Sequence, residues 1–298
     1  MPKTAPLEVD VVIVNWNSRS LLRECVHALD QSTIAQQLNV TIIDNHSRDG
    51  SADRLLAQNI RINLVRNAQN RGFAVACNQG AKRGNSPLLL FLNPDVRVRA
   101  DTVERAVQYL AKQSNSSVGI LGVQLLDPEG HVQRSCARTP TLMTLLLGTM
   151  FLDRLCPALV PSHFLSEHDH YSTRPVDQVM GAFLMIRRAL FHNLGEFDER
   201  FFVYYEDVDL CLAARECGWS VIHFAGAQAE HVGCGTTEAI KRRRLLYHAW
   251  SRVKFTSKRH GCMMAVVLSV CILLFELPIR YVYATIKSWV DGRSHPAK

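Results

Sequence analysis

The segment that most constrains the fold is an apolar run, Leu88–Leu92, followed directly by Asn93-Pro94-Asp95. Such a run is typical of a β-strand buried on both faces of a sheet. Proline has no N–H and cannot continue a central ladder, so the run predicts a strand that ends before Pro94 and leaves Asp95 at its carboxyl end. In open α/β sheets, ligands bind at that end of the strands.

Strand-like and helix-like segments alternate through the first hundred residues. Strands are predicted at 9–14, 40–43, 61–65 and 87–92, and helices at 18–29, at 73–82 and after a cap at Asp49 or Ser51. This alternation favours a mostly parallel α/β sheet with helices on both faces, typical of half a nucleotide-binding domain.

Beyond Asp95 the pattern changes to a mixed sheet. A hairpin is predicted from 118–126 and 131–135, further strands at 176–186 and 220–224, and a long loop at 153–175.

The C-terminal part differs from the rest in charge and hydropathy. Residues 241–298 hold 12 Lys and Arg and 2 Asp and Glu, in a chain of formal net charge +7. A basic helix is predicted at 236–259. The apolar run 262–275 has 14 residues, fewer than the roughly 18–20 that cross a bilayer. These features predict a peripheral or re-entrant helical tail at an anionic membrane surface, with an ordinary buried helix as the alternative.

Other features bear on partners and compartment. No nucleic-acid partner is expected, because the basic residues are not interleaved with stacking aromatics across the body of the chain. The nine cysteines are scattered without a Cys-x-x-Cys pair, which predicts neither a disulfide framework nor a structural zinc site. The polar N-terminus, Met1–Asp10, predicts no signal peptide, so we expect the cytoplasmic face of the cell membrane.

Four polar segments follow predicted strands. They are Asn15-Trp16-Asn17, Asp44-Asn45, Asn70-Arg71-Gly72-Phe73 and Asn93-Pro94-Asp95. Each alone is explained as a turn or a helix cap, but the carboxyl ends of parallel strands meet at one edge, so together they predict one crevice.

That crevice suits a nucleotide. Asp44 could accept the imide N–H of a pyrimidine base, and Gly72 and Gly80 would let the backbone approach a diphosphate. Asp95 is a hard oxygen ligand for Mg²⁺ or Mn²⁺, although one carboxylate needs a further ligand from elsewhere.

A second group of candidate residues lies at 197–211. An aromatic strand is predicted to lead into a helix at 206–217 that carries carboxylates in its first turn. The helix dipole alone could explain these acids. Partial burial beside Tyr204 and Tyr205 would raise the pKa of Glu206 and Asp207 toward the range of a general base.

His231 has two interpretations. It is either a structural histidine or the missing metal ligand, beside glycines that would let a loop close over a diphosphate. Arg242, Arg243 and Arg244 could assist the charge of the leaving group.

The ordered set of motifs resembles the family 2 glycosyltransferases, and among them the rhamnosyltransferases of bacterial cell-surface polysaccharide assembly. The resemblance covers about residues 9–260 and rests on the segments 12–17, 43–51, 70–80, 92–96, 181–188 and 197–211 and on the segment beginning at His231.

The resemblance implies a GT-A fold, in which a catalytic domain at 1–240 has a nucleotide-sugar half (1–100) and a metal and acceptor half (101–240), followed by the tail at 241–298. It implies a dTDP- or UDP-sugar donor and a divalent metal, Mg²⁺ or Mn²⁺. The expected donor-site residues are Asn15, Asn17, Asp44, Asn45, Asn70, Gly72, Phe73, Asn78 and Asn93.

By the same resemblance, Asp95 corresponds to the last carboxylate of an Asp-x-Asp metal motif, with Asn93 where many relatives have the first Asp. His231 becomes the second metal ligand, and Asp207 the catalytic base, with Glu206 beside it. The expected reaction is inverting transfer of L-rhamnose from dTDP-L-rhamnose to a lipid-linked saccharide. The alternatives are a sugar-phosphate nucleotidyltransferase and a non-catalytic, membrane-associated nucleotide-sugar binder.

Overall fold

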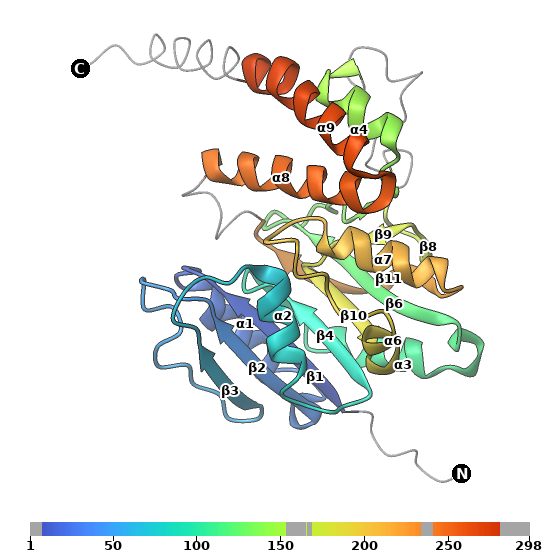
Figure 1. Cartoon of the computed structure of the whole chain (residues 1–298). Coiled ribbons are helices and arrows are strands. Elements are labelled where there is room, and N and C mark those ends of the chain that lie inside the picture. Colours follow the sequence, from blue (N-terminus) through green and yellow to red (C-terminus); the bar gives the residue numbers. More distant parts are fainter. Residues whose placement is uncertain (1–7, 153–164, 166–168, 234–240, 281–298) are drawn as a thin grey trace. The chain divides into compact units, whose positions relative to one another are not determined.

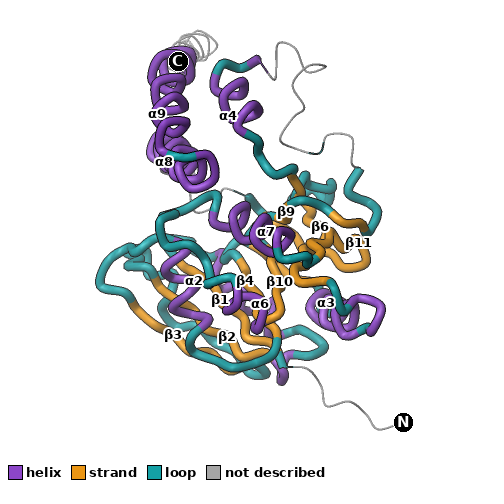
Figure 2. Tube along the Cα trace, turned by 45° about the vertical axis from the view of Figure 1, so that its right-hand side comes forward, coloured by secondary structure: helices purple, strands orange, loops and turns teal. Residues whose placement is uncertain are grey.

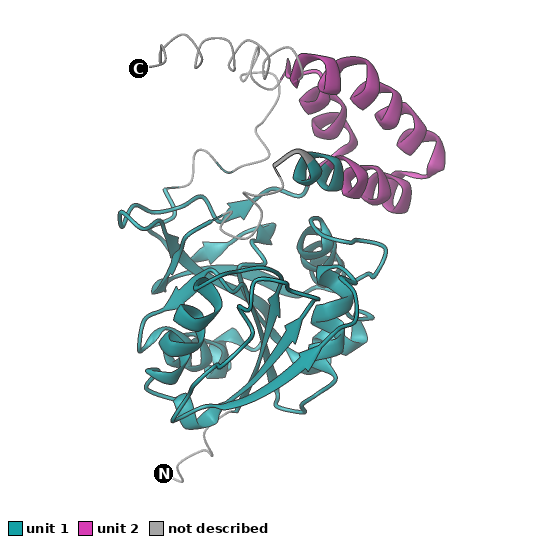
Figure 3. Cartoon of the chain, turned by 90° about the vertical axis from the view of Figure 1, so that its left-hand side faces the viewer, with its two compact units in different colours: residues 1–139, 164–248 teal, residues 140–163, 249–298 magenta. Residues whose placement is uncertain are grey.

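A computed structural model describes residues 8–152, 165, 169–233 and 241–280 (Figure 1). The chain divides into two compact units (Figure 3). Unit 1 comprises Met1–Thr139 and Phe164–His248, and unit 2 comprises Pro140–His163 and Ala249–Lys298. The boundary expected between residues 240 and 241 adjoins 234–240, outside the described residues, and stays a prediction.

Unit 1 is built on one mixed sheet of nine strands within the described residues. The strands are β1 Val9–Asn15, β2 Leu38–Asp44, β3 Arg61–Arg66, β4 Leu88–Leu92, β5 Val96–Val98, β6 Val118–Leu126, β8 Arg174–Pro175, β10 Phe183–Arg187 and β11 Ser220–His231. The short strands β7 Cys136–Ala137 and β9 Gln178–Val179 pair separately. The strand order is β3-β2-β1-β4-β10-β6-β11-β5, with β8 beside β11.

The direction of the strands changes at β10. Strands β3, β2, β1 and β4 are parallel to one another, whereas β10 runs antiparallel to both β4 and β6. Strand β11 is parallel to β6 and antiparallel to β5 and β8. This mostly parallel half that continues into a mixed half confirms the predicted fold class.

Helices pack on both faces of the sheet in unit 1. They are α1 Leu21–Asp30, α2 Phe73–Ala81, α3 Thr102–Ala111, α6 Arg188–Asn193 and α7 Glu206–Glu216. Unit 1 also contains the first part of α8 Lys241–His260 and 3-10 turns at Ala35–Gln37 and Gln113–Asn115. Alternate residues of β1 face opposite sides, so Val11 and Ile13 pack in a core with α1 and α3, and Val12 and Val14 in a core with α2, α6 and α7. Figure 2 shows these strands as one sheet, with α2 and α6 beside it.

Several predicted elements are wrong in detail. No helix follows Asp49 or Ser51, because the acceptors of Asp49 bind the backbone N–H groups of Ser51 and Arg19 in a loop. The predicted hairpin is reduced to one bridge between Leu126 and Val132, because both edges of β6 are taken by β10 and β11.

Two strand predictions also change. The strand predicted at 176–186 is divided into β9 and β10 by a turn at 180–182, and β11 is longer than predicted and ends at His231. The aromatic stretch before α7 is irregular, because Tyr204 and Tyr205 have positive φ angles of 68° and 72°. Most of the loop predicted at 153–175 lies outside the described residues.

Unit 2 contains α4 Leu142–Thr149, the rest of α8, and α9 Cys262–Cys271, which continues through a π-helical turn at Ile272–Glu276. The helix extends over Cys262–Arg280, 19 residues, and by length and composition could cross a membrane. The helix is longer than the apolar run 262–275 indicated, because it does not stop at Glu276. The carboxylate of Glu276 pairs with Arg252 and Arg280 inside the unit. The peripheral or re-entrant placement of this segment stays a prediction.

Candidate active site

The reversal of β10 brings the end of the sheet that carries Asp95 next to the start of α7. Phe183, the first residue of β10, pairs with Leu92, the last residue of β4. The N–H of Asn93 donates to the carbonyl of Ala182 (2.9 Å), and the N–H of Gly181 donates to Oδ2 of Asp207 (2.9 Å). Two successive residues, Gly181 and Ala182, therefore connect Asp207 to the Asn93-Pro94-Asp95 segment.

Asp95 and His231 lie together at this edge. Oδ1 of Asp95 is 3.6 Å from Nε2 of His231, and both residues are buried. Their backbones are joined as well, because the N–H of Val232 donates to the carbonyl of Asp95 (3.1 Å) and His231 pairs with Val96 across β11 and β5. Burial lowers the pKa of His231, and the charge of Asp95 acts against that shift.

This pair fits a divalent cation that takes its other ligands from a diphosphate and water. A carboxylate oxygen is a ligand that Mn²⁺ and Mg²⁺ prefer, a neutral imidazole can serve as a further metal ligand, and Mg²⁺ keeps several water or phosphate ligands. Within the described residues no group of three or more His, Cys, Asp or Glu gathers to form an all-protein site. Asp95 and His231 would therefore hold the metal only together with the donor.

A residue that sequence reasoning missed, Gln133, holds His231 in place. Its Oε1 lies 2.8 Å from Nδ1 of His231, and its Nε2 donates to the His231 carbonyl at 2.8 Å. The only signal in the sequence was its place within the strand predicted at 131–135, after the turn Asp127–Gly130. No local pattern shows that it meets His231, which is 98 residues away.

Glu206 and Asp207 begin α7 and have different surroundings. Asp207 accepts hydrogen bonds from the N–H groups of Gly181 and Val208 (2.8 Å) and from the side chain of Gln178. Glu206 is 5 % exposed, and its Oε2 has no hydrogen-bond partner within the described residues. Burial raises the pKa of both carboxyls, and the charge of Asp207 raises the pKa of Glu206 further.

The segment leading to these acids is fixed to α2. The side chain of Asn78 donates to the carbonyl of Phe197 (2.8 Å) and accepts from its N–H (3.0 Å). The N–H of Phe73 donates to the carbonyl of Phe202 (2.6 Å), and a Cβ on Gly72 would lie 2.6 Å from that oxygen. Asn78, Gly72 and Phe73 thus position the approach to Asp207.

The structure gives Gly72 and Gly80 a different role from the close approach to a diphosphate that the sequence predicted. The close approach that Gly72 permits is to Phe202, and the close approach that Gly80 permits is to the side chain of Val12. The α2 N-terminus is occupied by a protein carbonyl, so contact of Gly72 or Phe73 with a donor diphosphate stays a prediction.

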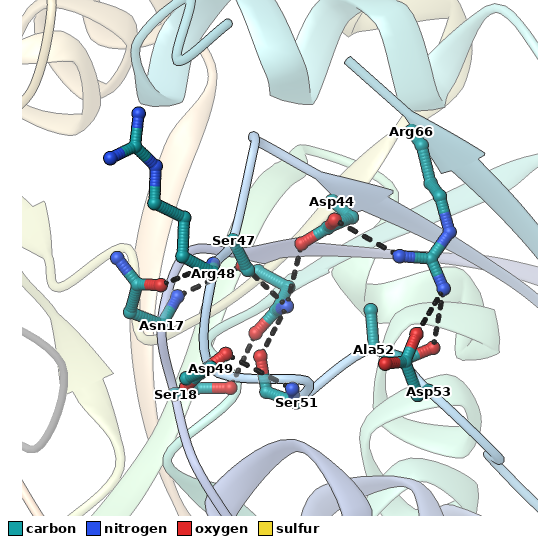
Figure 4. A network of polar contacts seen from close by, with 11 residues as sticks. Asn17, Ser18, Asp44, Ser47, Arg48, Asp49, Ser51, Ala52, Asp53 and Arg66 are labelled. Atoms are coloured by element: carbon teal, nitrogen blue, oxygen red, sulfur yellow. Dashed lines mark hydrogen bonds and ion pairs between the residues drawn. The ribbon is translucent and has the colours of Figure 1, made fainter. Parts of the chain in front are cut away.

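The predicted base-binding residues form a connected polar network (Figure 4). Asp44 is 3 % exposed, and its Oδ1 accepts from the amide of Asn15 (2.8 Å), which also contacts Ser47 and Ser51. Asn15 is fully buried, and its hydrogen bond fixes the orientation of the Asp44 carboxylate.

Two further residues complete this network. Asn17 uses its side-chain oxygen to accept from the N–H of Arg48 at 2.8 Å. Sequence reasoning missed Arg66, whose Nη1 lies 3.6 Å from Oδ2 of Asp44 while its Nη2 donates to Asp53 at 2.6 Å (Figure 4). Its position at the end of β3, parallel and adjacent to β2, was the available signal.

Asn45 and Asn70 organise the adjacent loop. The amide of Asn45 donates to Oδ1 of Asn70 (3.0 Å) and to the carbonyl of Gly72 (3.0 Å). Asn45 directly follows Asp44 and links Asn70 to it, and the contact of these residues with a donor stays a prediction. The side chain of Arg242, expected to assist the leaving group, lies outside the described part of the chain.

The chain matches the family model described as glycosyl transferase family 2 over residues 10–195. It therefore belongs to glycosyl transferase family 2. It is 26 % identical over 266 residues to an N-acetylglucosaminyl-diphospho-decaprenol L-rhamnosyltransferase of Mycobacterium tuberculosis, covering 84 % of each chain. It is 22 % identical over 191 residues to rhamnosyltransferase WbbL of Escherichia coli K12, covering 64 % of this chain and 69 % of that relative. These relatives confirm the resemblance to rhamnosyltransferases.

Solved structures share the fold of this family 2 glycosyltransferase. The mannosyltransferase PcManGT of Pyrobaculum calidifontis, in complex with GDP-Man and Mn²⁺, superposes with a TM-score of 0.56 at 16 % identity, covering 95 % of this chain and 80 % of that one. GalNAc-T7 with UDP, GalNAc and Mn²⁺ gives the same TM-score and identity over 77 % of this chain and 44 % of its own. The GT-A fold is confirmed.

Proposed function

We propose that this glycosyltransferase moves L-rhamnose from dTDP-L-rhamnose to a lipid-linked saccharide, with inversion at the anomeric carbon and a divalent metal, Mg²⁺ or Mn²⁺. The observation that carries the proposal is the connection of Asp207, through Gly181 and Ala182, to the strand end that bears Asp95. The rhamnosyl donor and the lipid-linked acceptor are supported by the names of the relatives, one of which acts on a decaprenol-linked sugar by name.

In the proposed reaction Asp207 is the general base. Its carboxylate takes the proton of an acceptor hydroxyl as that oxygen forms a bond to the anomeric carbon, and the bond from this carbon to the diphosphate breaks on the opposite face. The hydrogen bonds from Gly181 and Val208 fix the orientation of the carboxylate. The raised pKa of Asp207 makes it a stronger proton acceptor than an exposed aspartate.

We assign donor binding to Asp44 and to the pair of Asp95 and His231. Asp44 would accept the imide N–H of the base, since Asn15 fixes one of its oxygens and the other faces Arg66. Asp95 and His231 would hold the metal, which stabilises the charge that grows on the departing diphosphate. Asn93 contributes its backbone to the link with Ala182.

Unit 2 supplies the proposed membrane contact. On α9 and its continuation, Met263, Val266, Leu273 and Leu274 are more than 60 % exposed, and α8 is rich in Lys and Arg. Exposed apolar side chains next to cationic ones suit the surface of an anionic bilayer, where a lipid-linked acceptor resides. We assign this contact to the cytoplasmic face of the membrane.

The test is transfer by Asp207→Asn. Asparagine keeps the shape of the side chain but cannot take the proton, so kcat is expected to fall by about 10²–10⁴-fold. The assay offers dTDP-L-rhamnose, UDP-sugars and GDP-sugars with a polyprenyl-diphosphate GlcNAc acceptor, with and without Mn²⁺. Asp198→Asn, a partly exposed aspartate paired with Arg200 on the same approach segment, is the control.

Turnover of Asp207→Asn near that of the unaltered protein would contradict the role of Asp207. Transfer of the sugar from a UDP donor alone would replace the proposed dTDP donor. Family membership favours glycosyl transfer over nucleotidyl transfer and over non-catalytic binding, and binding of donor without turnover in any acceptor extract would reverse that preference.

A further inference from the structure

The side chain of Gln133 makes two hydrogen bonds to one residue, His231. Its Nε2 lies 2.8 Å from the His231 carbonyl oxygen, and its Oε1 lies 2.8 Å from the ring nitrogen Nδ1. A carbonyl oxygen can only accept, so the amide nitrogen of Gln133 must face it. The amide oxygen must then face Nδ1, and because an amide oxygen can only accept, Nδ1 must carry the proton.

This arrangement decides the tautomer of the neutral imidazole. With the proton on Nδ1, the other nitrogen, Nε2, carries a lone pair. Nε2 is the nitrogen that lies 3.6 Å from Oδ1 of Asp95. A lone pair and a carboxylate oxygen thus face each other in a buried setting, where each can bind a cation and neither can donate to the other.

Gln133 itself is held by the backbone. Its N–H donates to the carbonyl of Leu125 on β6 (2.8 Å), and the preceding turn is closed by bonds between Asp127 and His131. The hydrogen bond from the N–H of Val232 to the carbonyl of Asp95 holds the backbones of Asp95 and His231 together. The backbone of Gln133 is therefore anchored independently of His231, and the His231 carbonyl sets which end of the side-chain amide faces Nδ1.

We propose that Gln133 is a positioning residue that keeps the lone pair of His231 Nε2 directed at the cation shared with Asp95. Hydrogen bonds that orient a metal-binding histidine typically change metal affinity by about 10–100-fold when removed. The inference rests on the proposed function only in requiring a divalent cation at Asp95 and His231, and it makes no use of the transfer reaction.

Two measurements on the full-length protein test it. The first is Mn²⁺ affinity, measured by calorimetry with Mn²⁺ in the presence of dTDP. Gln133→Leu removes both hydrogen bonds and is expected to weaken Mn²⁺ binding by about 10-fold or more. Gln133→Glu keeps an acceptor for Nδ1 but loses the donor to the His231 carbonyl, so it is expected to weaken Mn²⁺ binding less than Gln133→Leu does. Gln108→Leu, an exposed glutamine on α3, is the control and should leave the affinity unchanged.

The second measurement is the tautomer of His231 in the metal-free protein, read from ¹⁵N NMR of the imidazole, with His231→Asn used for assignment. The Nδ1–H tautomer is expected in the unaltered protein, and a shift toward Nε2–H in Gln133→Leu. Even where Gln133→Leu does not fold, the unaltered protein can contradict the inference by showing the Nε2–H form.

Equal Mn²⁺ affinity in Gln133→Leu and the unaltered protein would overturn the proposal. So would a lack of Mn²⁺ binding in the unaltered protein. Both results leave the role of Asp207 in transfer to be decided by the separate Asp207→Asn assay, so failure of this inference is distinguishable from failure of the proposed function.

Discussion

At the scale of single residues, the neighbouring carboxyl groups of Glu206 and Asp207 differ in their hydrogen bonding. Asp207 receives hydrogen bonds that stabilise its charged form, whereas Oε2 of Glu206 is buried without a partner within the described residues. Burial raises the pKa of the Cys77 thiol, and the ionised form of Glu206 would raise it further. Glu206 is therefore the member of the pair that retains its proton, and Asp207 is the member that ionises first.

This difference predicts how stability depends on pH. The pKa of Glu206 is raised in the folded state, so the folded protein binds more protons than the unfolded chain above the ordinary value of 4.5. The contribution of Glu206 to the free energy of unfolding should be greatest below that value and should fall as the pH rises through the raised pKa. Glu206→Gln cannot ionise and should remove this part of the fall.

Urea denaturation at a series of pH values, beginning near pH 4.5, measures the effect of Glu206 on the free energy of unfolding. Glu129→Gln, which neutralises an exposed carboxylate, is the control and should retain the pH dependence of the unaltered protein. If Glu206→Gln loses stability with rising pH just as steeply as the unaltered protein, then another group is responsible.

At the scale of elements, α2 holds the segment that leads to Asp207, and its sequence did not predict this contact. The motif at 70–80 predicted a diphosphate site, yet Gly72, Phe73 and Asn78 contact the segment at 197–202 that leads to Asp207. The prediction of the helix itself was correct, because its spacing of small and apolar residues is a local property. Its partner could not be predicted, because the contact joins residues more than a hundred positions apart.

Gly72→Ala tests this contact. The added Cβ would meet the carbonyl of Phe202 at 2.6 Å in a residue whose φ is +88°, so both the clash and the backbone conformation are unfavourable. We expect a loss of stability of about 2–4 kcal/mol and a lower kcat. Gly218→Ala also has a positive φ, +82°, but has nothing within 4 Å of the added atom, and should cost only about 1 kcal/mol.

Thermal unfolding and the transfer assay compare the two variants. Equal losses in Gly72→Ala and Gly218→Ala would show that the contact with Phe202 is unimportant and that only the positive φ matters.

In unit 2, the ion pair of Arg252 on α8 with Glu276 at the end of α9 explains why a carboxylate is tolerated in an apolar helix. Both side chains are less than 10 % exposed, and Arg280 adds a second hydrogen bond at 2.9 Å. Removing one partner of a buried pair leaves an uncompensated charge.

We therefore expect Glu276→Leu to destabilise unit 2 by about 3–5 kcal/mol. Arg252→Met combined with Glu276→Leu should recover most of that loss, because no buried charge remains at this pair. Detergent-solubilised protein and thermal unfolding serve for the measurement. A double variant as unstable as Glu276→Leu alone would contradict the explanation.

At the scale of the whole molecule, charge is unevenly distributed along the chain. Residues 241–298 carry 12 of the 34 Lys and Arg and only 2 of the 27 Asp and Glu. Since the remaining residues hold more acidic than basic side chains, attraction to an anionic surface would come from the C-terminal part.

Binding to vesicles tests this assignment. Full-length protein is expected to bind phosphatidylglycerol vesicles more tightly than phosphatidylcholine vesicles, and less tightly as salt increases. Lys258→Glu with Arg259→Glu should weaken binding to anionic vesicles by at least about 2 kcal/mol, at about 1 kcal/mol per cation lost. Arg61→Glu with Arg83→Glu makes the same change of charge in unit 1 and should have little effect. Equal binding of both double variants would refute the assignment.

The sequence by itself determined the four parallel strands of the first hundred residues, most of the helices and the polar residues at the strand ends, because apolar periodicity and turn chemistry act over a few neighbouring residues. Asp44, Asp95, Asp207 and His231 could be selected in this way, together with the family. Only the tertiary structure decided that β10 runs antiparallel, and with it the link between Gly181 and Asp207. It also decided that Gln133 orients His231. Strand direction and such contacts depend on how distant segments pack together, and no short stretch of sequence carries that information.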